Sequence, residues 1–79
     1  MKEIKILGTG CAGCKALYAT VEKVVSDLGI NVTLTKEEDI MKIMEYNVMS
    51  LPAIVIDEKV AAKGKLTYEQ VTALVKQSL

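Results

Sequence analysis

The chain has 79 residues, 51% of them hydrophobic, and its ten basic residues balance ten acidic ones. This length suits one small domain, and we expect residues 1–79 to form it. No block of like charge is long enough for a nucleic-acid footprint, and no apolar run approaches a membrane span or a secretion signal, so we expect no nucleic-acid or membrane partner and a cytoplasmic location.

The first third of the chain has the pattern of a strand followed by a helix. The apolar run Ile4–Leu7 ends at the loop sequence Gly8-Thr9-Gly10, as a buried strand does where it meets a turn. Beyond the loop, apolar residues recur at three- and four-residue steps from Cys14 to Leu28, which predicts an amphipathic helix. Gly29 then stands where a left-handed helix end belongs.

The middle of the chain predicts a second strand and a second helix. Residues 30–35 alternate between apolar and polar, which is the period of a strand and completes a parallel βαβ unit. Thr35 and Glu38 have the spacing of a capping box and predict a helix toward Tyr46, with Asn47 as its left-handed stop.

The last third predicts a hairpin and a closing helix. Residues 53–56 form a continuous apolar strand, residues 57–58 a turn, and residues 60–62 a weaker strand. Gly64 interrupts the pattern, and the capping box of Thr67 and Gln70 opens a final helix. The element order βαβαββα is that of an α/β fold.

Two cysteines, Cys11 and Cys14, stand at the start of the first predicted helix. Two intervening residues let their sulfurs approach within bonding range, and the helix N-terminus favours thiolate over thiol. We therefore expect a redox-active pair with Cys11 as the attacking nucleophile and Cys14 as the resolving thiol. Ala12 and Gly13 are small and leave the sulfur accessible.

The same cysteine spacing also occurs in metal sites. A closed zinc site needs four ligands, and the chain has no histidine and no further cysteine. A two-coordinate Cu(I) carrier stays open as the alternative, because Gly10–Cys14 is similar to the metal loop of heavy-metal-associated domains. Against it, Thr9 stands where that family usually has methionine, and a helix rather than a strand is predicted after the second strand.

The segment Tyr46–Ile54 resembles the part of the thioredoxin family that leads into its cis-proline. The resemblance covers nearly the whole chain and is greatest to small thioredoxin-like or glutaredoxin-like redox-active disulfide proteins of archaea and bacteria. It implies a thioredoxin-like fold with a four-stranded mixed sheet flanked by three helices. It also implies that Pro52 is the cis-proline and that Leu51 before it helps to bind the partner peptide, beside Gly10, Ala12 and Gly13.

The resemblance further implies an activity and its partners. The protein would be a thiol-disulfide oxidoreductase that acts on protein disulfides and receives electrons from a reductase such as a thioredoxin-reductase-like flavoenzyme. It would act as a monomer, with no cofactor other than the Cys11–Cys14 disulfide.

Several residues depart from the family pattern or have a simpler interpretation. Lys5 stands where thioredoxins have a buried acid, so no acid-base helper for Cys14 can be carried over. The turn around Gly64 does not match the glutathione-binding turn of glutaredoxins. We interpret the remaining candidates as a surface lysine (Lys15), a packed tyrosine (Tyr18), core methionines (Met41, Met44 and Met49) and loop lysines near Pro52 (Lys63 and Lys65).

Overall fold

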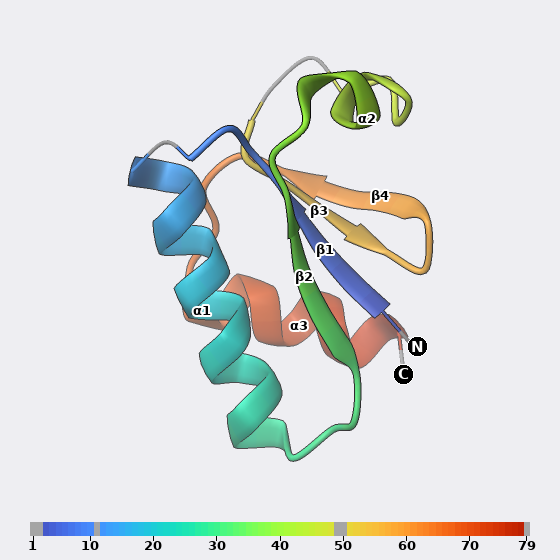
Figure 1. The fold of residues 1–79 in the computed structure, drawn as a ribbon. Coiled ribbons are helices and arrows are strands. Elements are labelled where there is room, and N and C mark those ends of the chain that lie inside the picture. The colour runs from blue at the N-terminus through green and yellow to red at the C-terminus, as the bar shows by residue number, and fades with distance from the viewer. Residues whose placement is uncertain (1–2, 11, 49–50, 79) are drawn as a thin grey trace.

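The protein folds as a four-stranded mixed sheet with three helices (Figure 1). The structure is a computed structural model and describes residues 3–10, 12–48 and 51–78. The elements are β1 (Glu3–Leu7), α1 (Ala12–Leu28), β2 (Thr33–Glu37), α2 (Ile40–Met44), β3 (Ala53–Ile56), β4 (Lys59–Lys63) and α3 (Tyr68–Ser78). The strand order is β2-β1-β3-β4, with β1 and β2 parallel and the other pairs antiparallel. The predicted order βαβαββα and the mixed sheet are thus confirmed.

The sheet carries a hydrophobic core on each of its two faces. Strand residues alternate between faces, so Ile4 and Ile6 of β1 point toward α1 and α3, and Leu7 points to the other face. The larger core includes Leu17, Val21 and Val24 of α1 and Val71 and Val75 of α3, all buried. The smaller core joins Leu7, Ala53 and Val55 to Ile43 of α2 and to Val48. None of the described helices is long and apolar enough to cross a membrane.

Three local signals in the sequence are confirmed at the ends of elements. Gly29 follows α1 with a φ of 63°, and Asn47 adopts a φ of 57° after α2, the left-handed conformation expected of both. At the start of α3, the Thr67 N–H donates to the Gln70 side chain at 2.9 Å, and the Gln70 N–H donates to the Thr67 hydroxyl at 3.2 Å. Both bonds of the predicted capping box are therefore present.

The second strand lies later in the chain than residues 30–35. It spans Thr33–Glu37, and its register pairs Glu3 with Thr33 and Leu7 with Glu37. Ile30 and Val32 still pack against the larger core, so the alternating pattern correctly indicated burial. It could not indicate pairing, because a strand forms only where a neighbouring strand supplies hydrogen-bond partners.

The capping box predicted at Thr35 and Glu38 is wrong, because Thr35 belongs to β2 and pairs with Lys5. The helix α2 instead begins at Ile40, with Asp39 as its N-cap accepting a hydrogen bond from the Met41 N–H at 2.9 Å. An aspartate side chain serves this purpose as well as a threonine.

The core packing predicted for the methionines of α2 is also wrong. Met41 is 69% exposed and Met44 is 61% exposed, whereas Ile43 is buried. A helix of five residues presents a single narrow face to the sheet, and Ile43 occupies it. Met49 lies outside the described residues.

Lys5 is the centre of a polar network on the sheet face that carries the smaller core. Its Nζ donates to the Tyr46 hydroxyl at 3.0 Å and to Oε1 of Glu58 at 2.9 Å. The Tyr46 hydroxyl donates to Oε2 of Glu58 at 3.1 Å, which closes the triangle. The hydrogen bonds that Lys5 donates to Tyr46 and Glu58 raise the pKa of Lys5, and the hydrogen bond that Glu58 accepts from Lys5 lowers the pKa of Glu58. The network links β1, the turn after α2 and the β3–β4 turn.

These pKa shifts predict how the network contributes to stability. A lowered carboxyl pKa stabilises the fold above the ordinary value of 4.5, and a raised lysine pKa stabilises it below the ordinary value of 10.5. We expect Glu58→Gln to lower the free energy of unfolding near pH 7, and the difference from wild type to vanish as the pH falls below 4.5. Denaturant unfolding across this pH range measures it, with Glu22→Gln on the exposed side of α1 as the control. A difference that does not shrink at all as the pH falls below 4.5 would contradict the assignment.

Candidate functional site

The candidate site lies where β1 ends and α1 begins. Cys14 is in the first turn of α1 and is 5% exposed. Its sulfur is disulfide-bonded. Cys11 lies outside the described residues, so its predicted role and its pairing with Cys14 stay predictions.

Gly8 determines how closely the end of β1 approaches Cys14. A Cβ atom added to Gly8 would lie 2.7 Å from the Cβ of Cys14 and closer still to its sulfur. Any side chain at this position would therefore displace Cys14 or the end of the strand. From the sequence, Gly8 is indistinguishable from an ordinary loop glycine except by its place. It directly follows an apolar strand and stands six residues before a buried cysteine, which is the signal that could have indicated the contact.

Pro52 lies on one side of the start of α1. It is buried, and the Leu51–Pro52 peptide bond is cis, as the resemblance implied. A Cβ atom on Gly13 would lie 3.9 Å from the Pro52 ring, within ordinary contact distance. The Gly64 N–H donates to the Pro52 carbonyl at 2.6 Å, which confirms that the loop of Lys63 and Lys65 lies near the proline. The fold therefore brings Gly13, Cys14 and Pro52 together from distant parts of the chain.

The other predicted binding residues border the same region. Leu51 is half-buried and packs against the smaller core. Gly10 is exposed with a φ of 87°, a conformation that favours glycine, and Ala12 is the exposed first residue of α1.

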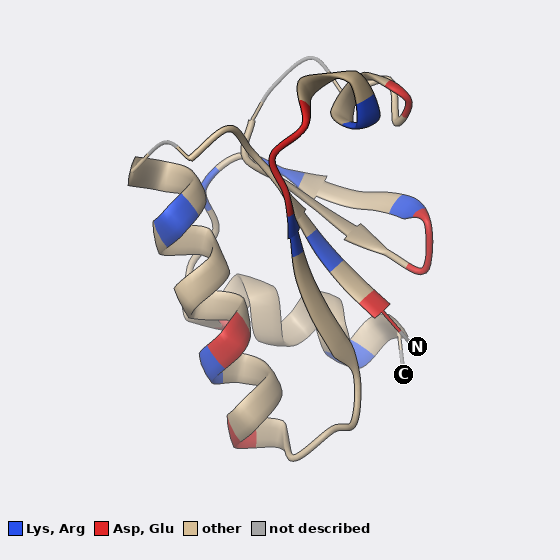
Figure 2. Cartoon of the chain, viewed as in Figure 1, with Lys and Arg blue, Asp and Glu red and all other residues tan. Residues whose placement is uncertain are grey.

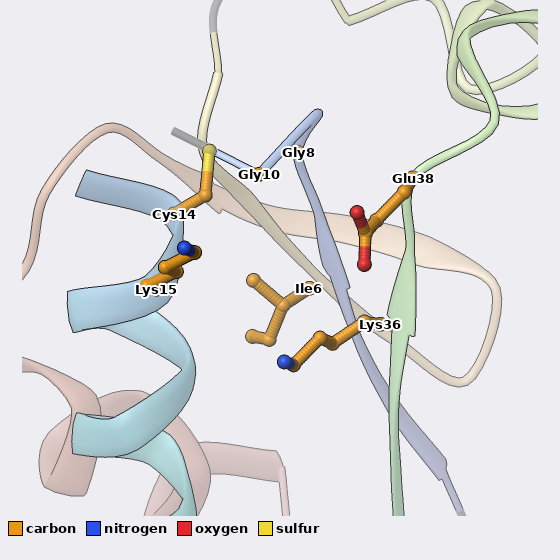
Figure 3. A pocket seen from close by; sticks show the side chains of 7 residues that line it. All are labelled: Ile6, Gly8, Gly10, Cys14, Lys15, Lys36 and Glu38. Carbon is orange, nitrogen blue, oxygen red and sulfur yellow. The ribbon is translucent and has the colours of Figure 1, made fainter. Parts of the chain in front are cut away.

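A pocket opens on the other side of Cys14, between α1 and the end of β2 (Figure 3). Its lining comprises Ile6, Gly8, Gly10, Cys14, Lys15, Lys36 and Glu38. Lys36 and Glu38 are site residues that sequence reasoning missed, because Lys36 lies on β2 and Glu38 directly after it, far along the chain from Cys14. The parallel register pairs Ile6 with Lys36, so both side chains lie on the sheet face that α1 covers. Figure 2 shows basic and acidic residues following one another at this end of β2.

The described residues contain no cluster of three or more His, Cys, Asp or Glu side chains that could hold a metal ion.

Comparison with known proteins identifies the relatives of this chain. Residues 2–76 match the family model described as a thioredoxin domain. The chain is 36% identical over 66 residues to a thioredoxin of Methanocaldococcus jannaschii, covering 84% of this chain and 76% of that protein. It is 30% identical over 70 residues to a thioredoxin of Methanothermobacter thermautotrophicus, covering 89% of this chain and 91% of that protein.

The chain belongs to the thioredoxin family. Solved structures have the same fold: a malarial protein aligns with a TM-score of 0.72 at 19% identity, covering 98% of this chain and 96% of its own. Thioredoxin 1 of Thermosipho africanus aligns with a TM-score of 0.64 at 16% identity, covering 96% and 92%. The family supports a thioredoxin-like redox protein, with thiol-disulfide oxidoreduction as its general activity.

This thioredoxin-family chain departs from the family pattern at Lys5, and the structure shows how the lysine is accommodated. Ile4 and Ile6 face α1, so Lys5 between them points to the opposite face. There Tyr46 and Glu58 hold its ammonium group.

The close approach of Gly8 to Cys14 predicts a strict size limit at Gly8. We expect Gly8→Ala to lower the free energy of unfolding by about 1–3 kcal/mol, which is the usual cost of overpacking. Gly13→Ala is the matched control, because its Cβ atom finds open space up to Pro52 and alanine favours a helix. Denaturant unfolding of both variants in the oxidised state measures the effect. Equal stability of Gly8→Ala and wild type would show that the strand end can move away.

Proposed function

We propose that this protein is a thiol-disulfide oxidoreductase that exchanges a Cys11–Cys14 dithiol/disulfide with protein disulfides. The observation that carries the proposal is the position of Cys14 in a chain of the thioredoxin family. Cys14 is buried in the first turn of α1, against the end of β1, and its neighbour Gly13 lies beside a cis-proline. Residues 1–79 would act as a single domain and a monomer in the cytoplasm.

The reaction proceeds in two thiol-disulfide exchange steps. The Cys11 thiolate attacks one sulfur of the partner disulfide, and the partner's other sulfur leaves as a thiolate and takes up a proton. The Cys14 thiol gives up its proton and attacks the Cys11 sulfur of the mixed disulfide, which releases the second partner thiol. Two electrons and two protons pass to the partner, and the protein ends with a Cys11–Cys14 disulfide.

The two cysteines have different roles because they have different access. Cys14 is only 5% exposed, so a folded partner cannot reach it, and we assign the role of attacking nucleophile to Cys11. The N-terminus of α1 stabilises a thiolate there through its free N–H groups and its dipole.

Pro52 and Leu51 form the docking side of the site. Pro52 is held in place by the Gly64 N–H and lies beside Gly13. A partner segment would lie against Pro52 and Leu51, with Gly10, Ala12 and Gly13 leaving space for its cysteine. Re-reduction of the protein would come from a dithiol donor such as a thioredoxin-reductase-like flavoenzyme.

The cysteine roles predict opposite outcomes for two single substitutions. With a peptide disulfide as substrate, we expect Cys14→Ser to accumulate a mixed disulfide, because the resolving thiol is missing. Cys11→Ser should form none, and its exchange rate should fall to that of a buried thiol, at least about a hundredfold below wild type. Mass spectrometry after acid quenching and alkylation identifies the adducts.

The wild-type protein supplies the control in this experiment. Titration in graded dithiothreitol buffers should give a single two-electron transition in which two thiols per chain become available for alkylation. A protein that forms no intramolecular disulfide at any poise, yet retains stoichiometric Cu(I) against a competing chelator, would be a soft-metal carrier and not an oxidoreductase.

A further inference from the structure

We infer that the pocket formed by Lys15, Lys36 and Glu38 beside Cys14 is a specificity subsite that receives a carboxylate of the partner protein. The inference rests on the proposed function and extends it to the class of substrate. Partner disulfides with an Asp or Glu next to the attacked cysteine are preferred over neutral or basic ones.

The two lysines of the pocket come from opposite walls. Lys15 follows Cys14 in the first turn of α1, and Lys36 lies on β2 with its ammonium group directed toward α1 (Figure 3). Ile6 lies between them and gives the pocket an apolar floor.

Tyr18 restrains the position of Lys36. The Nζ of Lys36 lies 4.6 Å from the centroid of the Tyr18 ring, within cation–π range. Tyr18 belongs to α1 and is partly buried against the larger core, so the position of its ring is fixed by the packing of the helix. A long lysine side chain held in this way loses less entropy when it binds a ligand.

The pocket charges are available to a ligand. Within the described part of the chain, Lys5 forms ion pairs with Glu3 and Glu58. Among the same residues, neither Lys15 nor Lys36 forms an ion pair with a carboxylate. The ammonium of Lys5 is thus saturated, whereas those of Lys15 and Lys36 face the pocket beside Cys14.

The position of the pocket fits a residue next to the partner's cysteine. Gly13 faces Pro52, and Lys15 lines the pocket, so the docking side and the pocket flank Cys14. A segment that lies on Pro52 and reaches the sulfur would extend its next residues over Lys15 and Lys36. Glu38 lies at the end of the pocket near Gly10, where the Glu38 Oε2 would be 3.6 Å from a Cβ atom added to Gly10. Its negative charge would repel a partner carboxylate from that end and favour a position beside the two lysines.

The test compares peptide disulfides that differ at one residue beside the cysteine: Asp, Asn or Lys. Pre-reduced protein is mixed with each peptide, and the second-order rate constant is measured by stopped flow. We expect wild type to favour Asp over Asn by roughly three- to fivefold, the range of a partly exposed ion pair, and Lys to be slowest. In 1 M salt, where the Debye length is about 3 Å, the ratio should fall toward one.

Substitutions in the pocket assign the preference to its charges. Lys36→Met should lower the Asp/Asn ratio, Lys36→Glu should lower it further, and Glu38→Gln should raise it. Lys23→Met is the matched control, since Lys23 is an exposed lysine on the same helix as Lys15 but lies with Thr20, Asp27 and Tyr68 away from Cys14. Circular dichroism verifies that each variant is folded.

Two results would overturn the inference while leaving the proposed function intact: an Asp/Asn ratio of one in wild type, or a ratio that Lys36→Met and Lys36→Glu leave unchanged. Failure to reduce any of the three peptides would instead contradict the proposed function itself. The salt titration needs no variant, so the inference stays testable even if the Lys36 variants do not fold.

Discussion

The contact between Gly8 and Cys14 is the constraint on which the site depends, because a strand and a helix meet there with no room for a side chain. The strand concerned is β1, which has neighbours on both sides in the sheet and sends Ile4 and Ile6 into the larger core. The helix is fixed on the same core by Leu17, Val21 and Val24. The position of the Cys14 sulfur is therefore set by the packing of the whole sheet–helix layer, rather than by the cysteine motif alone.

The rest of the site is assembled by topology. Gly13, Pro52 and Gly64 are far apart in the sequence, yet contact and hydrogen bonding link the helix start, the proline and the loop after β4. This arrangement depends on β3 lying beside β1 in the sheet. Because β3 begins directly after Pro52, its pairing with β1 brings the proline to the end of the sheet where α1 starts. The parallel pairing of β1 with β2 brings Lys36 and Glu38 to the same end of the sheet. The residues of the candidate site thus come from the ends of β1, β2 and β3 and from the start of α1.

The sequence predicted the structure correctly where a residue's conformation depends on its immediate neighbours in the chain. Gly29, Asn47 and the Thr67–Gln70 capping box are local devices, and each lies as predicted. It failed where the outcome depended on a distant partner. The exposure of Met41 and Met44 depends on how little of α2 reaches the sheet, and the role of Lys36 depends on its pairing with Ile6. The resemblance to thioredoxins supplied Pro52, which no local rule distinguishes from an ordinary strand-start proline.

The triangle of Lys5, Tyr46 and Glu58 also couples the substitutions that these three positions tolerate. Each member hydrogen-bonds to the other two, so the loss of one side chain removes two hydrogen bonds at once. An acid at position 5 would face Glu58 with a like charge, and a neutral or basic residue at position 58 would remove that repulsion. The effect of a substitution at one of these positions therefore depends on the residues at the other two.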